Sequence, residues 1–116
     1  VLFGLTIGNL FEGTPADMLP ALRRIRALPP GTRVWSAHEY TRTCTADALR
    51  LDPDNARLAA RVRAIEALPP ATPTVPLSLA EEAATNPYLR WDDPVLRARL
   101  GTSGDEDTFD RLCAEG

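Results

Sequence analysis

The sequence has no lysine and only one histidine, His38, among its 116 residues. Its two cysteines, Cys44 and Cys113, lie too far apart in the chain to form a metal knuckle of closely spaced thiols. A bound zinc ion needs three or four protein ligands, so one imidazole cannot hold a metal by itself. These absences exclude a metal centre built from the usual histidine and cysteine ligands of this chain alone.

Long hydrophobic runs and an excess of positive charge are also missing. No apolar run approaches about 18 residues, which argues against a membrane partner. The net charge of −3 argues against nucleic acid as a general partner. No signal peptide is recognisable, and this favours two free thiols in a reducing cytoplasm. We therefore expect a cytoplasmic protein with neither nucleic acid nor membrane as its partner.

The composition that remains is that of a globular protein. Hydrophobic residues make up 44% of the chain and charged residues 25%. A chain of this length buries a smaller share of its surface than a large one, so one compact core is the upper limit. The class expected from the pattern along the chain is α+β and mostly helical.

Two segments have the pattern of strands. Residues 1–7 are apolar and partly β-branched and resemble a strand cut from a longer sheet. Four apolar side chains there, Leu2, Phe3, Leu5 and Ile7, are then expected to lack strand neighbours and to promote self-association. Residues 33–37 predict a second strand, which ends just before His38.

Capping residues and apolar periodicity predict six helices. The first begins at the Thr14 cap and buries Met18, Leu22 and Ile25, but Pro20 implies either a bend or a start near Leu19. The second is expected near 45–51, and the third starts with a cap at Asp52 and first turn at Pro53 and has an apolar stripe of Leu58, Val62 and Ile65. A capping box that begins at Ser78 opens the fourth, which stops at Asn86-Pro87. The fifth runs from Asp93-Pro94 to Gly101, and the last covers 107–114. Between the third and fourth, the prolines of residues 68–76 predict a stiff extended connector.

Several polar residues have a simple structural interpretation. We expect Glu81 and Glu82 to form a helix cap and a solvent-exposed face. The solvent-exposed face of the preceding helix is expected to carry Arg57, Arg61 and Arg63. Both tryptophans, Trp35 and Trp91, are expected to pack in the core or between domains.

No independent catalytic constellation is present. Ser36 and His38 share one strand face, but the sequence has no Gly-x-Ser-x-Gly elbow and no acid partner for them. Cys44 lies near His38 in the sequence without a third group to orient the pair. Gly4 and Gly8 bracket a turn that lacks the pattern of a phosphate-binding loop.

Four segments in register resemble one enzyme family. They read GNLFEGTP at 8–15, TRVWSAHEYT at 32–41, PDN at 53–55 and PTVPLSLAEEAATNPYLR at 73–90. Together they are similar to the C-terminal part of hydroxyacylglutathione hydrolase, or glyoxalase II, in the metallo-β-lactamase superfamily. The last quarter of the chain is the weakest part of this match.

The resemblance implies a fold and a reaction. Residues 1–42 would be the C-terminal end of a metallo-β-lactamase (αββα) domain with two short strands, and residues 43–116 a helical domain that covers the substrate. Such enzymes hydrolyse S-lactoylglutathione to glutathione and lactate, using two metal ions, usually zinc and sometimes iron or manganese. The family's Thr-His-x-His-x-Asp-His segment and bridging aspartate would precede Val1, so this chain would lack the N-terminal half of the fold.

The resemblance also assigns residues. His38 falls at the position of the family's last metal-ligating histidine. Substrate contacts are implied for residues 9–11 and 38–40, namely Asn9, Leu10, Phe11, His38, Glu39 and Tyr40. Cys113 and Gly116 fall where the family places basic residues for the glycine carboxylate of glutathione.

Two hypotheses from different classes follow. In the first, the chain is the C-terminal portion of a metal-dependent thioester hydrolase that binds no metal and is inactive without its N-terminal half. In the second, it is a non-catalytic helical module or a remnant that binds a partner.

Overall fold

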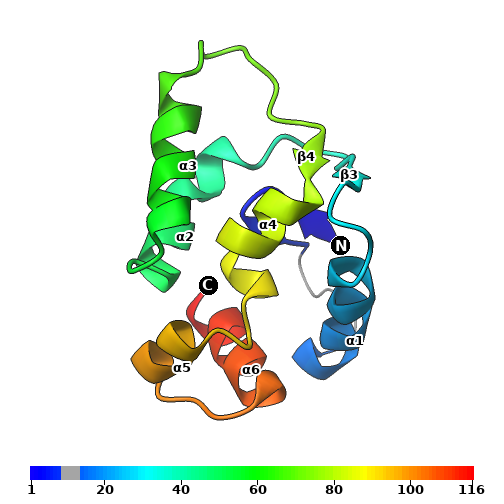
Figure 1. The fold of residues 1–116 in the computed structure, drawn as a ribbon, viewed down its shortest axis with the longest axis vertical. Coiled ribbons are helices and arrows are strands. Elements are labelled where there is room, and N and C mark those ends of the chain that lie inside the picture. The colour runs from blue at the N-terminus through cyan, green and yellow to red at the C-terminus, as the bar shows by residue number, and fades with distance from the viewer. Residues whose placement is uncertain (9–13) are drawn as a thin grey trace.

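The structure, a computed structural model, describes residues 1–8 and 14–116 and is mostly helical (Figure 1). This confirms the expected class. The α-helices are α1 (Pro15–Arg26), α2 (Thr45–Leu51), α3 (Ala56–Ala67), α4 (Leu79–Thr85), α5 (Pro94–Leu100) and α6 (Asp105–Glu115). Two short 3-10 helices are η1 (Arg42–Cys44) and η2 (Pro87–Leu89), and the strands are β1 (Leu2–Phe3), β2 (Thr6–Ile7), β3 (Arg33–Val34) and β4 (Leu77–Ser78).

Residues 1–7 form a hairpin, so the expectation of one continuous strand is wrong. β1 pairs antiparallel with β2, and Leu2 lies opposite Ile7. The turn needs two unusual features: Gly4 lies tight against Thr41, and Leu5 adopts a positive φ of 61°. The expectation that the apolar residues of this segment lack strand neighbours is therefore wrong. Leu2 and Leu5 are buried and Phe3 and Ile7 half-buried, while self-association stays a prediction.

The second predicted strand is shorter than expected. Only β3 pairs, with β4, so that Val34 lies opposite Leu77. Trp35 follows β3 and is 71% exposed, so the prediction that it packs in the core is wrong. Trp91 is fully buried as expected, with its ring edge-on to Phe109 at 6.3 Å between centroids.

Helix α1 begins at the predicted Thr14 cap and runs through Pro20 to Arg26. Asp17 accepts a hydrogen bond from the Thr14 backbone N–H at 2.8 Å, which stabilises the first turn. Because the helix starts at Pro15, the alternative start near Leu19 is wrong.

Two predicted helix starts are shifted. Asn55, and not Asp52, caps α3, because its side chain accepts from the backbone N–H of Arg57 and of Leu58. Buried Asp52 accepts instead from the Asn55 amide and from Arg90 Nε at 2.9 Å. The last helix, α6, begins at Asp105, two residues before the predicted start.

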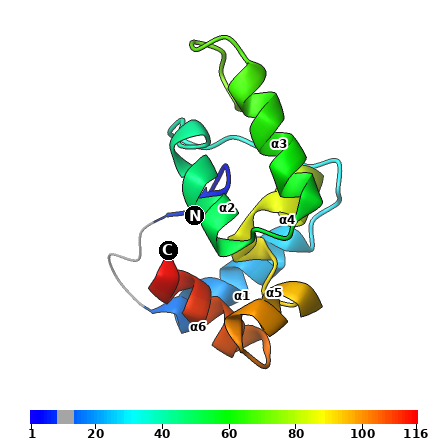
Figure 2. The same ribbon diagram turned by 90° about the vertical axis from the view of Figure 1, so that its left-hand side faces the viewer.

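The core has two parts. The larger joins α1, α5, α6 and η2, where α1 packs against α6 (Figures 1 and 2). The smaller lies between α2, α3 and the hairpin turn and consists of Leu5, Ala48, Leu58, Val62 and Ile65. Leu5 is thus the hairpin's contribution to a core that is otherwise helical. The connector 68–76 arches from the end of α3 back to β4 (Figure 1).

A buried ion pair links α3 to α4. Glu82 is fully buried, and its Oε1 lies 2.5 Å from the Arg61 guanidinium. Its Oε2 accepts from the backbone N–H of Leu5 and from the Asn86 amide, both at 3.1 Å. The expectations that Glu82 and Arg61 face solvent are therefore wrong, and this carboxylate joins both helices to the hairpin turn.

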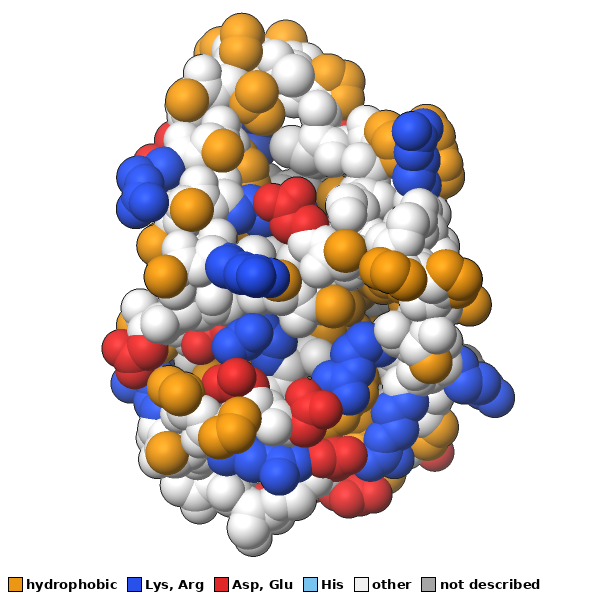
Figure 3. All heavy atoms as spheres, in the orientation of Figure 1, with side chains coloured by type: hydrophobic (Ala, Val, Ile, Leu, Met, Phe, Trp, Pro, Cys, Tyr) orange, Lys and Arg blue, Asp and Glu red, His pale blue; other side chains and the backbone are white. Residues whose placement is uncertain are grey.

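The surface carries charges of both signs close together. Over the lower half of the face in Figure 3, arginines and carboxylates alternate, and pairs such as Arg23 with Asp105 and Arg26 with Asp92 join α1 to the C-terminal helices and the loop before them. Within residues 1–8 and 14–116, no helix combines the length and the apolar character that crossing a bilayer requires.

Replacing Glu82 by Gln should lower the free energy of unfolding by about 3–5 kcal/mol, because Arg61 then stays buried without its counter-charge. Chemical denaturation followed by circular dichroism measures this. The matched control is Glu81→Gln, since the Glu81 side chain is 52% exposed and lies 3.8 Å from Arg61. That change should stay within about 0.5 kcal/mol. Equal losses for the two variants would contradict the role of Glu82.

Replacing Gly4 by Ala should lower stability by about 1–3 kcal/mol. A Cβ at Gly4 would lie 1.9 Å from the Thr41 hydroxyl, so the turn or Thr41 must move. Gly31→Ala serves as the control, because nothing lies within 4 Å of its added Cβ. Thermal melts of both variants test the prediction, and an unchanged melting temperature for Gly4→Ala would refute it.

Candidate functional site

His38 lies on the surface in a cluster of three rings. Its imidazole is 5.3 Å from the Tyr40 ring and 6.4 Å from the Phe3 ring, and Phe3 and Tyr40 are 5.1 Å apart. The hairpin supplies Phe3, and the segment after β3 supplies the other two rings. His38 is exposed, so its nitrogens are open to ligands from outside the chain.

The serine next to this cluster does not activate the histidine or receive its proton. The Ser36 hydroxyl donates to the backbone carbonyl of His38 at 3.0 Å. This geometry agrees with the absence of a serine nucleophile motif from the sequence.

Glu39 binds the proline-rich connector. Its Oε2 accepts from the Thr74 hydroxyl at 2.5 Å, and its Oε1 accepts from the backbone N–H of Thr74 and of Val75 at 2.9 and 3.1 Å. The Thr74 hydroxyl, followed by the two backbone donors, lowers the pKa of the Glu39 carboxyl. The structure therefore gives Glu39 a structural partner, and its contact with substrate remains a prediction.

The residues present do not fit a metal centre. No cluster of three or more His, Cys, Asp or Glu side chains in the described ranges could hold a metal ion. His38 is the one imidazole of the sequence. Within residues 1–8 and 14–116, His38 therefore lacks the further ligands that a zinc site needs.

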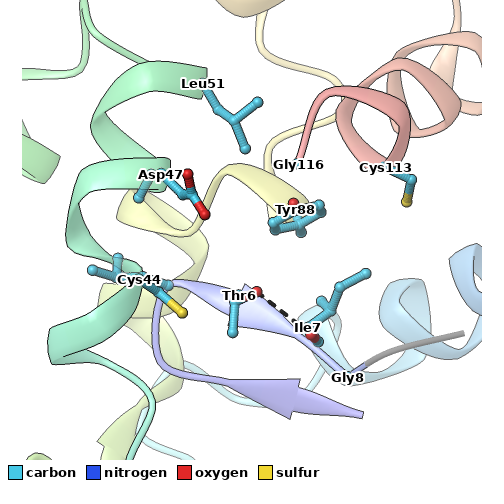
Figure 4. Close-up of a pocket in the computed structure, with 11 residues that line it drawn as sticks. Thr6, Ile7, Gly8, Cys44, Asp47, Leu51, Tyr88, Cys113 and Gly116 are labelled. Atoms are coloured by element: carbon cyan, nitrogen blue, oxygen red, sulfur yellow. Dashed lines mark hydrogen bonds between the residues drawn. The ribbon is translucent and has the colours of Figure 1, made fainter.

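A pocket of about 400 Å³ lies beside the hairpin (Figure 4). Its walls come from the hairpin, from η1 and α2, from η2, and from the end of α6. The lining residues are Leu5, Thr6, Ile7, Gly8, Cys44, Asp47, Ala48, Leu51, Tyr88, Cys113 and Gly116.

Phe3 connects this pocket to the ring cluster. The Cβ position of Gly8, on the pocket wall, lies 3.5 Å from the Phe3 ring. The same ring is one of the three in the cluster that contains His38. The pocket and the exposed imidazole therefore belong to one region of the surface, on either side of the hairpin.

Both cysteines line this pocket as free thiols, Cys44 on one side and Cys113 on the other (Figure 4). Burial raises the pKa of Cys113 to about 11, so this side chain is a neutral thiol at pH 7. Burial also raises the pKa of Tyr88. The pocket thus presents the neutral Cys113 thiol and the Tyr88 phenol together with the Asp47 carboxylate.

The predicted site residues divide into four groups. His38 and Tyr40 lie together in the ring cluster, whereas Glu39 binds Thr74 of the connector. Cys113 and Gly116 line the pocket on the side opposite Cys44. Three others, Asn9, Leu10 and Phe11, fall outside the described residues. Sequence reasoning missed Tyr88, although its place after Asn86-Pro87, in a segment that carried the family resemblance, was an available signal.

Comparison with known proteins identifies the family. The model described as "Hydroxyacylglutathione hydrolase C-terminus" matches residues 39–115. A hydroxyacylglutathione hydrolase of Synechococcus sp. (strain JA-3-3Ab) is 50% identical over 112 residues, which are 96% of this chain and 44% of the relative. That of Maricaulis maris (strain MCS10) is 50% identical over 91% of this chain and 42% of its own length. The enzyme of Rhodobacter capsulatus is 54% identical over 84% of this chain and 39% of its own length.

The chain therefore belongs to the hydroxyacylglutathione hydrolase family and corresponds to its C-terminal region. It spans less than half the length of these curated relatives. The resemblance drawn from the four sequence segments is confirmed.

Replacing Glu39 by Gln should destabilise the fold at pH 7 but not in acid. A carboxyl whose pKa is lowered on folding stabilises the protein above its ordinary pKa of 4.5, and this contribution is lost as the pH falls through the folded value. The stability gap between wild type and variant should therefore shrink from pH 7 to about pH 3. Denaturation at both pH values measures it, with exposed Glu66→Gln as the control. A gap that is constant with pH would contradict the prediction.

Proposed function

We propose that this chain forms the C-terminal part of a metal-dependent thioester hydrolase that acts on glutathione thioesters of the S-lactoylglutathione class. Residues 1–42 would belong to the metallo-β-lactamase-like domain, and residues 43–116 would form the helical unit that covers the substrate. The observation that carries the proposal is family membership combined with one exposed imidazole at the expected ligand position.

In this proposal His38 is a metal ligand. Its exposure and the flanking rings of Phe3 and Tyr40 support the role, because they fix the direction of the imidazole without covering it. The remaining ligands of the two metal ions, zinc in the first instance, would come from residues that this chain does not contain. We assign no step of the metal chemistry to the residues of this chain.

The substrate would lie between His38 and the pocket. Tyr40 and Glu39, together with Asn9, Leu10 and Phe11, are the proposed contacts from the sequence resemblance. The proximity of the ring cluster to the pocket through Phe3 and Gly8 supports this path for the thioester. The two free thiols add polarizable sulfur to the pocket wall.

The proposal predicts that the 116 residues alone bind no stoichiometric zinc and do not hydrolyse S-lactoylglutathione. A chimera that joins the N-terminal part of the Synechococcus relative to this chain should hydrolyse it at millimolar substrate. His38→Ala in the chimera should lower the rate by more than about 100-fold. Loss of a metal ligand should cost more activity than loss of a residue that only hydrogen-bonds to a ligand, which typically costs about 10- to 100-fold.

Elemental analysis and a thioester assay provide the measurements. The control is Ser36→Ala, whose hydroxyl bonds only to the backbone in the structure and whose loss should change the rate less than about threefold. A folded chimera that loads metal but shows no turnover would contradict the proposal and favour a non-catalytic module. Turnover by the 116 residues alone would contradict the assignment of the other ligands.

A further inference from the structure

The charges around the pocket beside the hairpin point to the kind of ligand that it accepts. We propose that this pocket binds an uncharged polar end of the thiol part of the substrate, such as a carboxamide, in preference to a carboxylate. The inference rests on the proposed function for the nature of the ligand. Its physical basis is a phenol that faces the pocket and the absence of a lining cation among the described residues.

Tyr88 supplies the donor. The residue is 9% exposed. Among the described residues its backbone N–H donates to Asn86 Oδ1, whereas its hydroxyl has no hydrogen-bond partner. Figure 4 shows the phenol within the pocket, between the hairpin and the end of α6. A phenol O–H that faces a cavity can donate to an acceptor oxygen of a bound molecule.

Gly116 keeps this hydroxyl accessible. An added Cβ there would lie 1.8 Å from the Tyr88 oxygen, so any larger residue would press on the phenol. The family resemblance places a basic residue at this position, but here the structure leaves no room for one without a shift of Tyr88. Cys113 and Gly116 stand where the family resemblance places basic residues, and both line the pocket.

No cation lines the pocket among the described residues, whereas the Asp47 carboxylate does. Residues 9–13, outside the described ranges, read Asn-Leu-Phe-Glu-Gly and carry no cationic side chain. The Asp47 carboxylate would repel a second carboxylate in the pocket, and no lining cation among the described residues would offset that repulsion. A carboxamide is uncharged and is not repelled in this way, and its oxygen can still accept a hydrogen bond from the Tyr88 hydroxyl.

Arg50 is the cation that could change this balance. Its guanidinium lies at the rim, where it donates to the backbone carbonyl of Glu115 at 2.6 Å and lies 3.5 Å from Asp47. Its backbone carbonyl in turn accepts from Arg99. Arg50 is therefore held by the end of α6 and by Asp47, and it does not line the cavity.

A matched pair of non-hydrolysable probes tests the proposal on the 116-residue chain. The probes are S-methylglutathione and its glycine amide, which differ in one carboxylate. Titrations followed by two-dimensional NMR give the two dissociation constants. We expect the amide to bind at least about 10-fold more tightly, which corresponds to one uncompensated charge. Equal or tighter binding of the acid, or no binding of either probe at millimolar concentration, would overturn the proposal.

Four variants assign the preference to the named residues. Cys113→Arg should raise the affinity for the acid by about 10-fold or more and leave the amide nearly unchanged, whereas Cys113→Ala should preserve the wild-type ratio. Tyr88→Phe should weaken the amide several-fold. Arg50→Ala should leave the preference intact, and a selective loss of acid binding would show that Arg50 does enter the pocket and would overturn the inference.

These measurements need no turnover. A preference for the acid would refute the pocket's selectivity and leave hydrolysis by the chimera untouched. A chimera without turnover would refute the proposed reaction while the two dissociation constants still report on the pocket.

Discussion

The fold depends on one buried carboxylate. Glu82 faces Arg61 on one side and, on the other, accepts from the backbone of Leu5 and from Asn86. An ion pair without solvent is favourable only when its remaining polar atoms are also satisfied, and here the hairpin turn satisfies them. The turn itself is unfavourable for a leucine, because Leu5 has a positive φ. The carboxylate and the apolar pocket for Leu5 together offset that strain.

Much of the helical part could be predicted from the sequence because its signals are local. Thr14, Ser78 and Asp93 act at the ends of their helices as expected, and the stripe of Leu58, Val62 and Ile65 is buried. Signals that depend on contacts distant in the sequence were missed. The partner of Glu82 lies on another helix, so nothing near Glu82 in the sequence distinguishes it from exposed Glu81. For the same reason the local sequence predicts that Asp52 caps α3, whereas in the structure its carboxylate pairs with Arg90.

The sequence predicts which family the site residues belong to, but it does not predict the pocket beside them. His38 and Tyr40 were found through resemblance to a family, and that family is confirmed over residues 39–115. The pocket was not foreseen, because it forms where the hairpin, α2, η2 and the end of α6 meet. Cysteines 44 and 113 are distant in the sequence and line the same cavity, a proximity that only the fold reveals. The shape of this region thus depends on packing between segments as well as on single motif residues.

Leu5 has a further consequence for how the chain acquires its structure. Its backbone bond to Glu82 spans 77 residues, and its side chain completes the smaller core. Closing a loop of this length costs conformational entropy, so this contact is a long-range one in a chain whose helices rest mostly on local bonds. The same hairpin supplies Leu5, Thr6, Ile7 and Gly8 to one wall of the pocket. The shape of that wall therefore depends on a contact between opposite ends of the chain.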